Sequence, residues 1–149
     1  MRTLLPALCL LAGTLHTLHA AAQAIEFRSV KEAAIMYETP SEQGKRLFIV
    51  QPGTPVEVVV VSGEWIRVRD SAGAITWMQA GTLSSRRTVM VSADRATVRQ
   101  QPDSAAPAAF EAVRNTVLEV RGTPANGWVQ VAHGDGSTGY LRVTEAWGL

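Results

Sequence analysis

A pattern that occurs twice constrains this chain more than any other feature. Its first copy lies in residues 63–78 and its second in residues 127–141. Each copy has two arms joined by a short glycine-containing turn, with one aromatic residue opening the first arm and another in the second arm. Self-similarity at a fixed spacing marks a duplicated structural unit. The sequence therefore predicts two copies of one fold.

The duplication extends over residues 25–149. Matching residues keep an offset of 62 as far as Val120, and one extra residue within 122–127 then raises the offset to 63. The aromatic residues that match across the copies are Trp65 with Trp128 and Trp77 with Tyr140. Because matches by chance would not keep their register, we expect one unit at 25–87 and a second at 88–149.

Hydrophobic patterning predicts strands and no helices in both units. Residues 56–61 are rich in β-branched side chains, which suit a pleated surface. Alternation predicts that one set of side chains faces the core, namely Val56, Val58 and Val60, matched by Leu118, Val120 and Gly122. No window of helical length carries a 3.6-residue period. Short strands at this spacing predict an all-β chain of two tandem small barrels with about five strands each.

Residues 1–24 have the composition of a secretory signal peptide. Arg2 precedes the apolar run of residues 4–12, and small residues offer cleavage after Ala20, Ala22 or Ala24. The apolar run is too short to span a bilayer in the mature protein. We therefore expect secretion across the inner membrane to the periplasm or the exterior, with no membrane span after cleavage.

Composition excludes several classes of site in the mature chain. The leader removes Cys9 and two of the three histidines, so that His133 alone remains. This excludes a cysteine nucleophile, a disulfide and a zinc site built from Cys and His. Without Arg2 the 14 basic residues become 13, against 13 acidic ones, and the net charge is zero. A nucleic-acid partner normally requires a basic surplus, so we expect no nucleic acid. We also expect no metal and no cofactor.

The connection between the units, residues 83–88, contains neither glycine nor proline. It therefore predicts a short link that packs the barrels side by side. Arg86 and Arg87 are expected to be solvated, with ion pairs to acidic groups of either barrel as the alternative. Val59 and Val61 are apolar on the outer face of the first unit only, which makes them candidates for this contact or for a partner. Trp147 is expected to cover the second barrel, with a partner contact as the alternative.

The repeated residues resemble the bacterial Src-homology-3-type domain. The resemblance rests on a Pro-containing loop, a Gly-x-x-Val/Leu-Glu-Val strand, Gly-x-Trp-x-x-Val or Gly-Trp-x-x-Val, a glycine turn and Gly-Tyr-Leu. It covers essentially residues 25–149, and the second copy matches best, whereas the first has Thr76 where the family has glycine. The resemblance implies non-catalytic envelope modules that bind cell-wall material or protein segments, often as accessories to peptidoglycan enzymes or receptors.

The resemblance also indicates a ligand site in each barrel. Trp65 and Trp128 occupy the position of the tryptophan that lines the proline-rich ligand groove of eukaryotic relatives. Trp65 shares a strand face with Arg67 and Arg69, an arrangement that suits stacking on a sugar ring or clamping a carboxylate-bearing peptide. The candidate ligand-binding residues are Tyr37, Trp65, Arg67, Arg69, Trp128 and Tyr140. The alternative is that both tryptophans merely close the open end of each barrel.

Two departures from the eukaryotic groove narrow the choice of ligand. A proline and a tyrosine normally follow the last aromatic residue of that groove. Gln79-Ala80 and Arg142-Val143 stand in those places here. The sequence therefore argues against recognition of a Pro-x-x-Pro ligand.

Two motifs in the second hairpin suggest catalysis but do not fit it. Residues 134–139 have Gly-x-Gly-x-x-Gly spacing, yet strands are expected on both sides, where nucleotide binding requires a following helix. His133, Asp135 and Ser137 lie within five residues on one turn and cannot converge as a catalytic triad. We interpret Asp135-Gly136 as a hairpin turn and predict that the protein is not an enzyme.

The leading hypothesis is a non-catalytic cell-envelope binding module that recognises peptidoglycan or a wall-associated peptide. The alternative is an interaction or scaffold module for an envelope protein, with Val59, Val61 and Trp147 as the partner contacts. The sequence leaves open whether one barrel or both bind.

Overall fold

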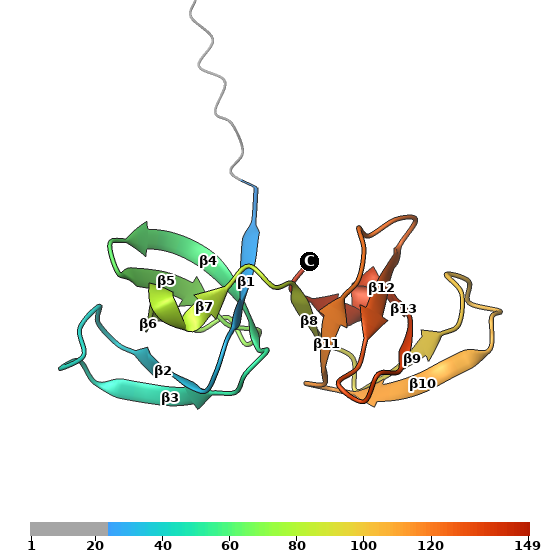
Figure 1. Ribbon diagram of the computed structural model, residues 1–149, viewed down its shortest axis with the longest axis horizontal. Helices are drawn as coiled ribbons and strands as arrows, with labels where there is room; N and C mark the ends of the chain where they lie inside the picture. The colour runs from blue at the N-terminus through green and yellow to red at the C-terminus, as the bar shows by residue number, and fades with distance from the viewer. Residues whose placement is uncertain (1–23) are drawn as a thin grey trace, which may run out of the picture.

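The computed structural model describes residues 24–149, so the predicted leader lies outside the described residues except for Ala24. The described chain is all-β, with two short 3-10 turns and two antiparallel sheets of seven strands each. Figure 1 shows each sheet curled on itself, one beside the other, with the C-terminus at the boundary between them. The prediction of two tandem small barrels is confirmed, with seven strands in each sheet where about five were expected.

The first barrel spans seven strands and one 3-10 turn, η1 (Ala80–Thr82). Its strands are β1 (Glu26–Val30), β2 (Ala34–Tyr37), β3 (Arg46–Val50), β4 (Pro55–Ser62), β5 (Trp65–Arg69), β6 (Ile75–Gln79) and β7 (Leu83–Ser84). They are hydrogen-bonded in the order β3-β2-β6-β5-β4-β1-β7.

The second barrel repeats this arrangement strand for strand, with η2 (Val143–Glu145) in the place of η1. Its strands are β8 (Thr88–Val91), β9 (Arg95–Arg99), β10 (Ala108–Val113), β11 (Val117–Val120), β12 (Trp128–Ala132), β13 (Thr138–Arg142) and β14 (Ala146–Trp147). The order β10-β9-β13-β12-β11-β8-β14 matches the first sheet.

The backbone extends the internal alignment to the first strand of each barrel. Val30 N donates to Thr54 O at 3.0 Å, and Val91 N donates to Thr116 O at 2.9 Å. Because these bonds are equivalent, Val30 of the first copy corresponds to Val91 of the second, an offset of 61. The second copy therefore has one extra residue in the bend after its first strand.

Each barrel encloses its own core of aliphatic side chains. Ile66 and Val68 of β5 are fully buried, as is Val131 of β12, while Val129 is 1% exposed. Burial of one such side chain stabilises a fold by about 1.5–3 kcal/mol. Two separate clusters with equivalent members show that the duplication includes the packing as well as the strands.

A β-bulge in β4 changes the predicted core face. Val58 pairs with Val68 and Val60 pairs with Arg67, so one extra residue of β4 lies between these pairs. A bulge reverses the alternation beyond it because two residues face one on the neighbouring strand. Val56 is buried as expected, but Val60 is 46% exposed. The prediction that Val60 faces the core was wrong for this reason.

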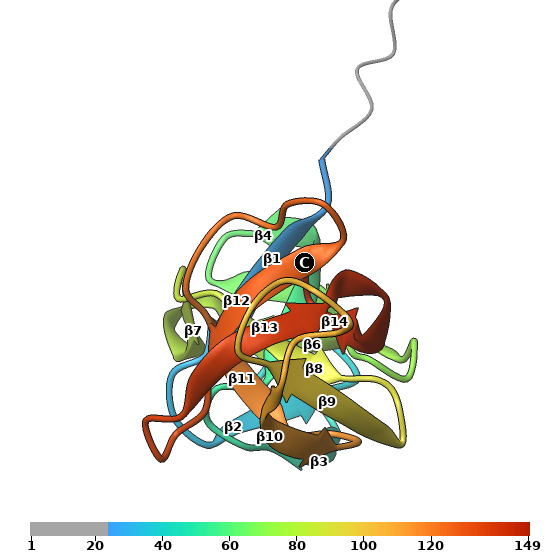
Figure 2. The same ribbon diagram turned by 90° about the vertical axis from the view of Figure 1, so that its right-hand side faces the viewer.

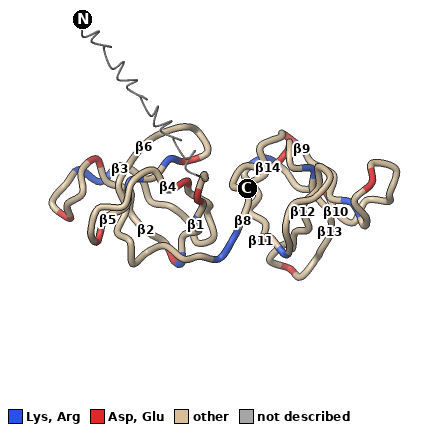
Figure 3. The backbone as a smooth tube through the Cα atoms, turned by 90° about the horizontal axis from the view of Figure 1, so that it is seen from above, with Lys and Arg blue, Asp and Glu red and all other residues tan. Residues whose placement is uncertain are grey.

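The link between the barrels is hydrogen-bonded to both of them. Ser29 Oγ of β1 donates to Arg86 O at 2.7 Å, and Val120 N of β11 donates to Arg87 O at 3.0 Å. The Arg86 guanidinium forms an ion pair with Glu119, and Arg87 Nη2 donates to Gly148 O at 2.9 Å. Both arginines are exposed, as expected, and each also binds a group of the second barrel. Figure 3 shows this blue segment crossing between the barrels.

The barrels also contact each other directly. The rings of Phe27 and Trp147 meet edge to face, with centroids 5.1 Å apart and an interplanar angle of 82°. Thr88 Oγ1 donates to Gly53 O at 2.7 Å. Trp147 was expected to cover the second barrel, but it packs against Phe27 of the first. Viewed along the long axis, one barrel lies behind the other (Figure 2).

Gly148 allows the C-terminus to enter this interface. Its φ is +115°, and a Cβ atom there would lie 2.8 Å from Thr88 O and 3.1 Å from Pro55 Cβ. The Pro55 end of β4 therefore faces the second barrel. Val61 lies toward the opposite end of β4 and is 57% exposed. Val61 therefore lies away from the inter-barrel contact that was predicted for it, and Val59 is half-buried on the same strand.

We expect Thr76→Val to raise the free energy of unfolding by about 1 kcal/mol. The hydroxyl of Thr76 is buried without a hydrogen-bond partner, and valine keeps the shape of the side chain. Gly139, at the equivalent position, provides the contrast: a Cβ there would lie 2.6 Å from Arg99 O, so Gly139→Ala should destabilise. Urea denaturation measures both variants, and a destabilised Thr76→Val would contradict the argument.

We expect Phe27 and Trp147 to be energetically coupled. A double-mutant cycle with Phe27→Leu and Trp147→Leu should give a coupling of about 0.5–1.5 kcal/mol, typical of edge-to-face aromatic pairs. Both single variants should also broaden the distribution of inter-barrel distances in small-angle scattering. Additive effects of the two changes would show that the ring contact contributes nothing to holding the barrels together.

We expect the pKa of Glu119 to lie below its ordinary value of 4.5, because Arg86 hydrogen-bonds and attracts the carboxylate. The stabilisation of the link is then fully present above this ordinary value and is lost as the pH falls through the lowered pKa. NMR titration of the Glu119 carboxyl carbon measures the shift. Arg86→Gln should return the pKa toward 4.5, and an unchanged pKa in that variant would exclude the ion pair as the cause.

Candidate functional site

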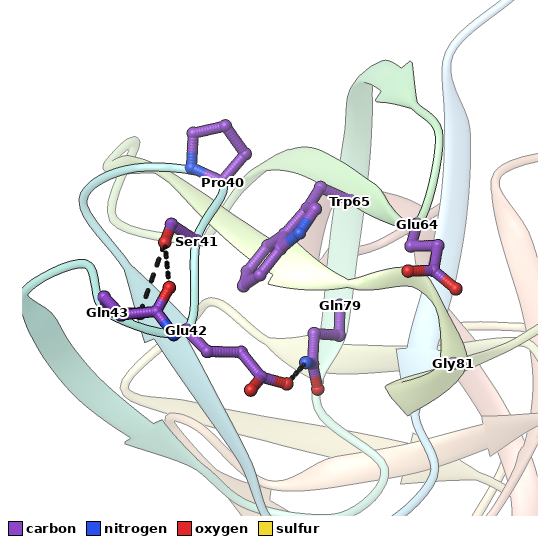
Figure 4. A pocket seen from close by; sticks show the side chains of 8 residues that line it. All are labelled: Pro40, Ser41, Glu42, Gln43, Glu64, Trp65, Gln79 and Gly81. Carbon is purple, nitrogen blue, oxygen red and sulfur yellow. Dashed lines mark hydrogen bonds between the residues drawn. The ribbon is translucent and has the colours of Figure 1, made fainter.

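An open groove lies beside Trp65 in the first barrel. Its volume is about 610 Å³. The groove is lined by Pro40, Ser41, Glu42, Gln43, Glu64, Trp65, Gln79 and Gly81. Figure 4 shows the Trp65 ring between the loop that carries Pro40 and Ser41 and the side that carries Glu64. The groove therefore brings together the β2–β3 loop, the start of β5 and the end of β6.

Strand alternation and one aromatic contact orient Trp65. Ile66 and Val68 point into the core, so Trp65 points outward from the same strand. The Tyr37 ring meets Trp65 edge to face, with centroids 5.3 Å apart and an interplanar angle of 87°. Tyr37 is only 7% exposed. Tyr37 was predicted to bind ligand directly, but its burial leaves it the role of supporting the ring of Trp65.

Hydrogen bonds between nearby residues hold both walls of the groove. Gln43 N donates to Ser41 Oγ at 3.2 Å, and Ser41 N donates to Thr39 O at 2.8 Å. On the other side, Ala80 N donates to Glu64 O at 2.8 Å. Gln79 Nε2 bridges the walls by donating to Glu42 Oε1 at 2.6 Å, the contact drawn in Figure 4. The walls are therefore formed before any ligand binds.

The groove is acidic. Its lining includes the two carboxylates Glu42 and Glu64 and no basic residue. Arg69 is turned to its neighbouring strand, where its Nη1 lies 2.9 Å from both carboxylate oxygens of Glu57. Arg67 is exposed and pairs across the strands with Trp77. The three outward residues share a face as predicted, but neither Arg67 nor Arg69 lines the Trp65 groove.

Glu42 and Glu64 were not among the predicted site residues. Glu64 precedes Trp65 directly and could have been found from that position. Glu42 lies 23 residues away in a loop that the sequence shows only as irregular. Its approach to Trp65 depends on β2 lying beside β6, which no local pattern reveals.

The equivalent tryptophan of the second barrel is covered. Trp128 is 9% exposed, and the guanidinium carbon of Arg142 lies 4.8 Å from the centroid of its ring. The longer loop of residues 122–127 is closed by paired backbone bonds, Ala125 N to Trp128 O at 2.9 Å and Trp128 N to Ala125 O at 3.0 Å. The extra residue found in the sequence therefore lies in the loop that leads directly to this tryptophan.

A smaller cleft remains beside this covered ring. It is lined by Pro102, Gly122, Thr123, Ala125, Asn126, Trp128, Gln130 and Tyr140. Tyr140, a predicted ligand-binding residue, is half-buried in this lining, which contains no carboxylate. The grooves of the two barrels are therefore chemically different despite their common backbone.

The second hairpin turn has a structural role for its polar residues. Asp135 Oδ1 accepts a bond from Ser137 N at 2.8 Å and lies 3.0 Å from His133 Nδ1. The hydrogen bonds from Ser137 and then His133 lower the pKa of Asp135 to about 2. In the first copy Asp70 Oδ1 accepts bonds from Ala72 N and Ala74 N, both at 2.9 Å. These contacts stabilise turns.

Neither a metal cluster nor a membrane helix is found in the described chain. Within residues 24–149 no three His, Cys, Asp or Glu side chains are grouped so that they could hold a metal ion. In the same residues, no helix has the length and apolar character needed to cross a membrane.

Comparison with known proteins gives fold neighbours at low similarity. NlpC2 from Trichomonas vaginalis is 14% identical with a TM-score of 0.39, covering 85% of this chain and 49% of its own. NlpC1 from the same organism is 13% identical with a TM-score of 0.39, covering 90% and 50%. An NlpC/P60 family protein from Bacillus cereus is 16% identical with a TM-score of 0.38, covering 82% and 56%. This chain thus spans about half the length of these proteins. No curated protein matches it.

The sequence model of the bacterial SH3 domain matches the chain twice, over residues 30–85 and 92–148. These two matches coincide with the two barrels and cover most of the described chain. Bacterial SH3 domains are binding-type domains that often bind cell-wall components or proteins, and they are typical of extracellular or envelope proteins. The chain belongs to the bacterial SH3 domain family and carries two consecutive copies of the domain.

Proposed function

We propose that this protein is a non-catalytic module of the cell envelope that binds peptidoglycan through the Trp65 groove of its first barrel. The proposal includes secretion to the periplasm or the exterior, directed by residues 1–24, and two structural units at 25–87 and 88–149. The observation that carries it is the asymmetry of the two tryptophans. Trp65 is half-buried and lines an open groove whose walls are hydrogen-bonded, whereas Trp128 is only 9% exposed.

An indole ring at the floor of an open groove suits the wall polymer. Aromatic rings bind the apolar faces of sugars and peptide side chains while polar groups at the rim orient them. Because the walls are already hydrogen-bonded, little loop ordering opposes binding. Of the predicted ligand-binding residues, Trp65 is therefore the one that we propose contacts the ligand, with Tyr37 behind it and Arg67 at its flank.

The second candidate is docking of an envelope protein on the first barrel, away from the groove. Ile25, Val60 and Val61 are 69%, 46% and 57% exposed, and Ile25 lies with residues 58–61 at one shallow depression. Apolar side chains gathered in this way favour a protein contact. Val59 and Val61 keep their proposed partner role in this candidate, whereas Trp147 is occupied by Phe27.

We expect the protein to co-sediment with purified sacculi and Trp65→Ala to weaken this binding by roughly tenfold, the loss expected when one stacked ring is removed. Trp128→Phe is the matched control, since its ring is covered, and should bind like the wild type. Val61→Asp tests the second candidate and should also leave sedimentation unchanged. A protein that stays in the supernatant, or that binds equally well without the Trp65 ring, would contradict the proposal.

A further inference from the structure

We infer that the Trp65 groove recognises a cation: an ammonium group on the peptide part of the wall, held over the Trp65 ring near Glu42 and Glu64. This inference rests on the proposed function and names the chemical group to which the groove binds. It reverses the charge that the sequence suggested for the ligand, since Arg67 and Arg69 had indicated a carboxylate.

The first support is the charge of the groove. Glu42 and Glu64 both line the groove that holds the Trp65 ring, Glu42 beside Gln79 and Glu64 next to the start of β5 (Figure 4), and no basic side chain is among the lining residues. Glu42 Oε1 accepts its bond from the neutral amide of Gln79, so the charge of this carboxylate is not neutralised by that contact. By contrast, the carboxylates of Glu57 and Glu119 are each paired with an arginine. A carboxylate-bearing ligand would be repelled here, and a cation would be attracted by both carboxylates.

The second support comes from the other barrel, where a cationic side chain of the same barrel already lies over the equivalent ring. Arg142 lies over Trp128 with its guanidinium carbon 4.8 Å from the ring centroid, within the range of a cation–π contact. The residue at the matching position in the first barrel is Gln79. The first barrel therefore presents the same ring without a cation of its own.

The two barrels are complementary in a third respect. Glu42 is matched by Ser104 in the second barrel, and Glu64 is matched by Gly127. The barrel that supplies its own cation lacks both carboxylates, and the barrel with both carboxylates lacks the cation. The two barrels thus differ at all three positions. Each difference makes the first barrel better suited than the second to bind a cation from outside.

The geometry favours a peptide amine over a neutral sugar. A sugar ring could stack on Trp65, but two carboxylates would add nothing specific to that contact. An ammonium group can stack over the ring, and the carboxylates that line the groove offer acceptors for its three N–H donors. Free amino groups occur on the peptide side chains of peptidoglycan, so this chemistry is available on the proposed ligand.

The first test compares untreated sacculi with sacculi whose amino groups have been acetylated. Acetylation removes the positive charge, and we expect the full chain to bind the acetylated sacculi roughly tenfold more weakly. Glu42→Gln combined with Glu64→Gln should produce a similar loss on untreated sacculi. Both positions are exposed, so these changes should leave the thermal unfolding transition in place.

A swap between the barrels supplies a matched pair of variants. Gln79→Arg places the second barrel's cation over Trp65 and should block binding. Arg142→Gln uncovers part of Trp128 but adds no carboxylate, and it should leave binding at the wild-type level. Equal binding to acetylated and untreated sacculi would overturn the inference and leave the proposed function intact.

The second test does not depend on sacculi and separates the two proposals. Nα-acetyl-lysine amide should shift the NMR signal of the Trp65 indole N–H, assigned with Trp65→Phe, whereas its Nε-acetylated form should not. Absence of sedimentation together with a lysine-specific shift would overturn the proposed function alone. Equal responses to the charged and the acetylated compound would overturn the inference.

Discussion

The packing of Ile66 and Val68 into the first core is the constraint on which the rest of the barrel depends. Both side chains are fully buried on one face of β5, and a strand that buries one face must present the other. Trp65, Arg67 and Arg69 are therefore turned outward together. A slip of one residue would expose the core and bury two guanidinium groups, so the register of β5 is strongly determined. The binding surface is thus a consequence of how the core is filled.

The second barrel uses the same constraint for a different result. Val129 and Val131 repeat the inward face, and Trp128 again lies on the outward one. The second barrel has one extra residue in the preceding loop, and where the first barrel has Gln79 it has Arg142, which lies over the ring. Duplication has therefore kept the backbone and the core while the chemistry of the two grooves diverged.

Contacts between the barrels hold the two domains together. Ser29 and Thr88 are both buried and both donate hydrogen bonds across the junction, while Phe27 and Trp147 close it on another side. Link residues bonded on both sides leave little freedom for the barrels to turn independently. The open groove of the first barrel and the covered ring of the second are therefore held in one arrangement, with the C-terminal residues in the seam.

The sequence by itself determined the two units, their all-β character, the outward face of β5 and the absence of a triad in the second turn, because these depend on local alternation and on comparison of the copies. Only the tertiary structure decided the charge of the groove, the exposure of Val60 and the place of Trp147. Glu42 lies near Trp65 because strands that are distant in the sequence pair with each other. Arg69 forms an ion pair with Glu57 of the neighbouring strand β4. The bulge in β4 and the contact with Phe27 likewise join residues far apart in the chain. Such interactions depend on which strands become neighbours in space, and a local sequence pattern carries no information about that.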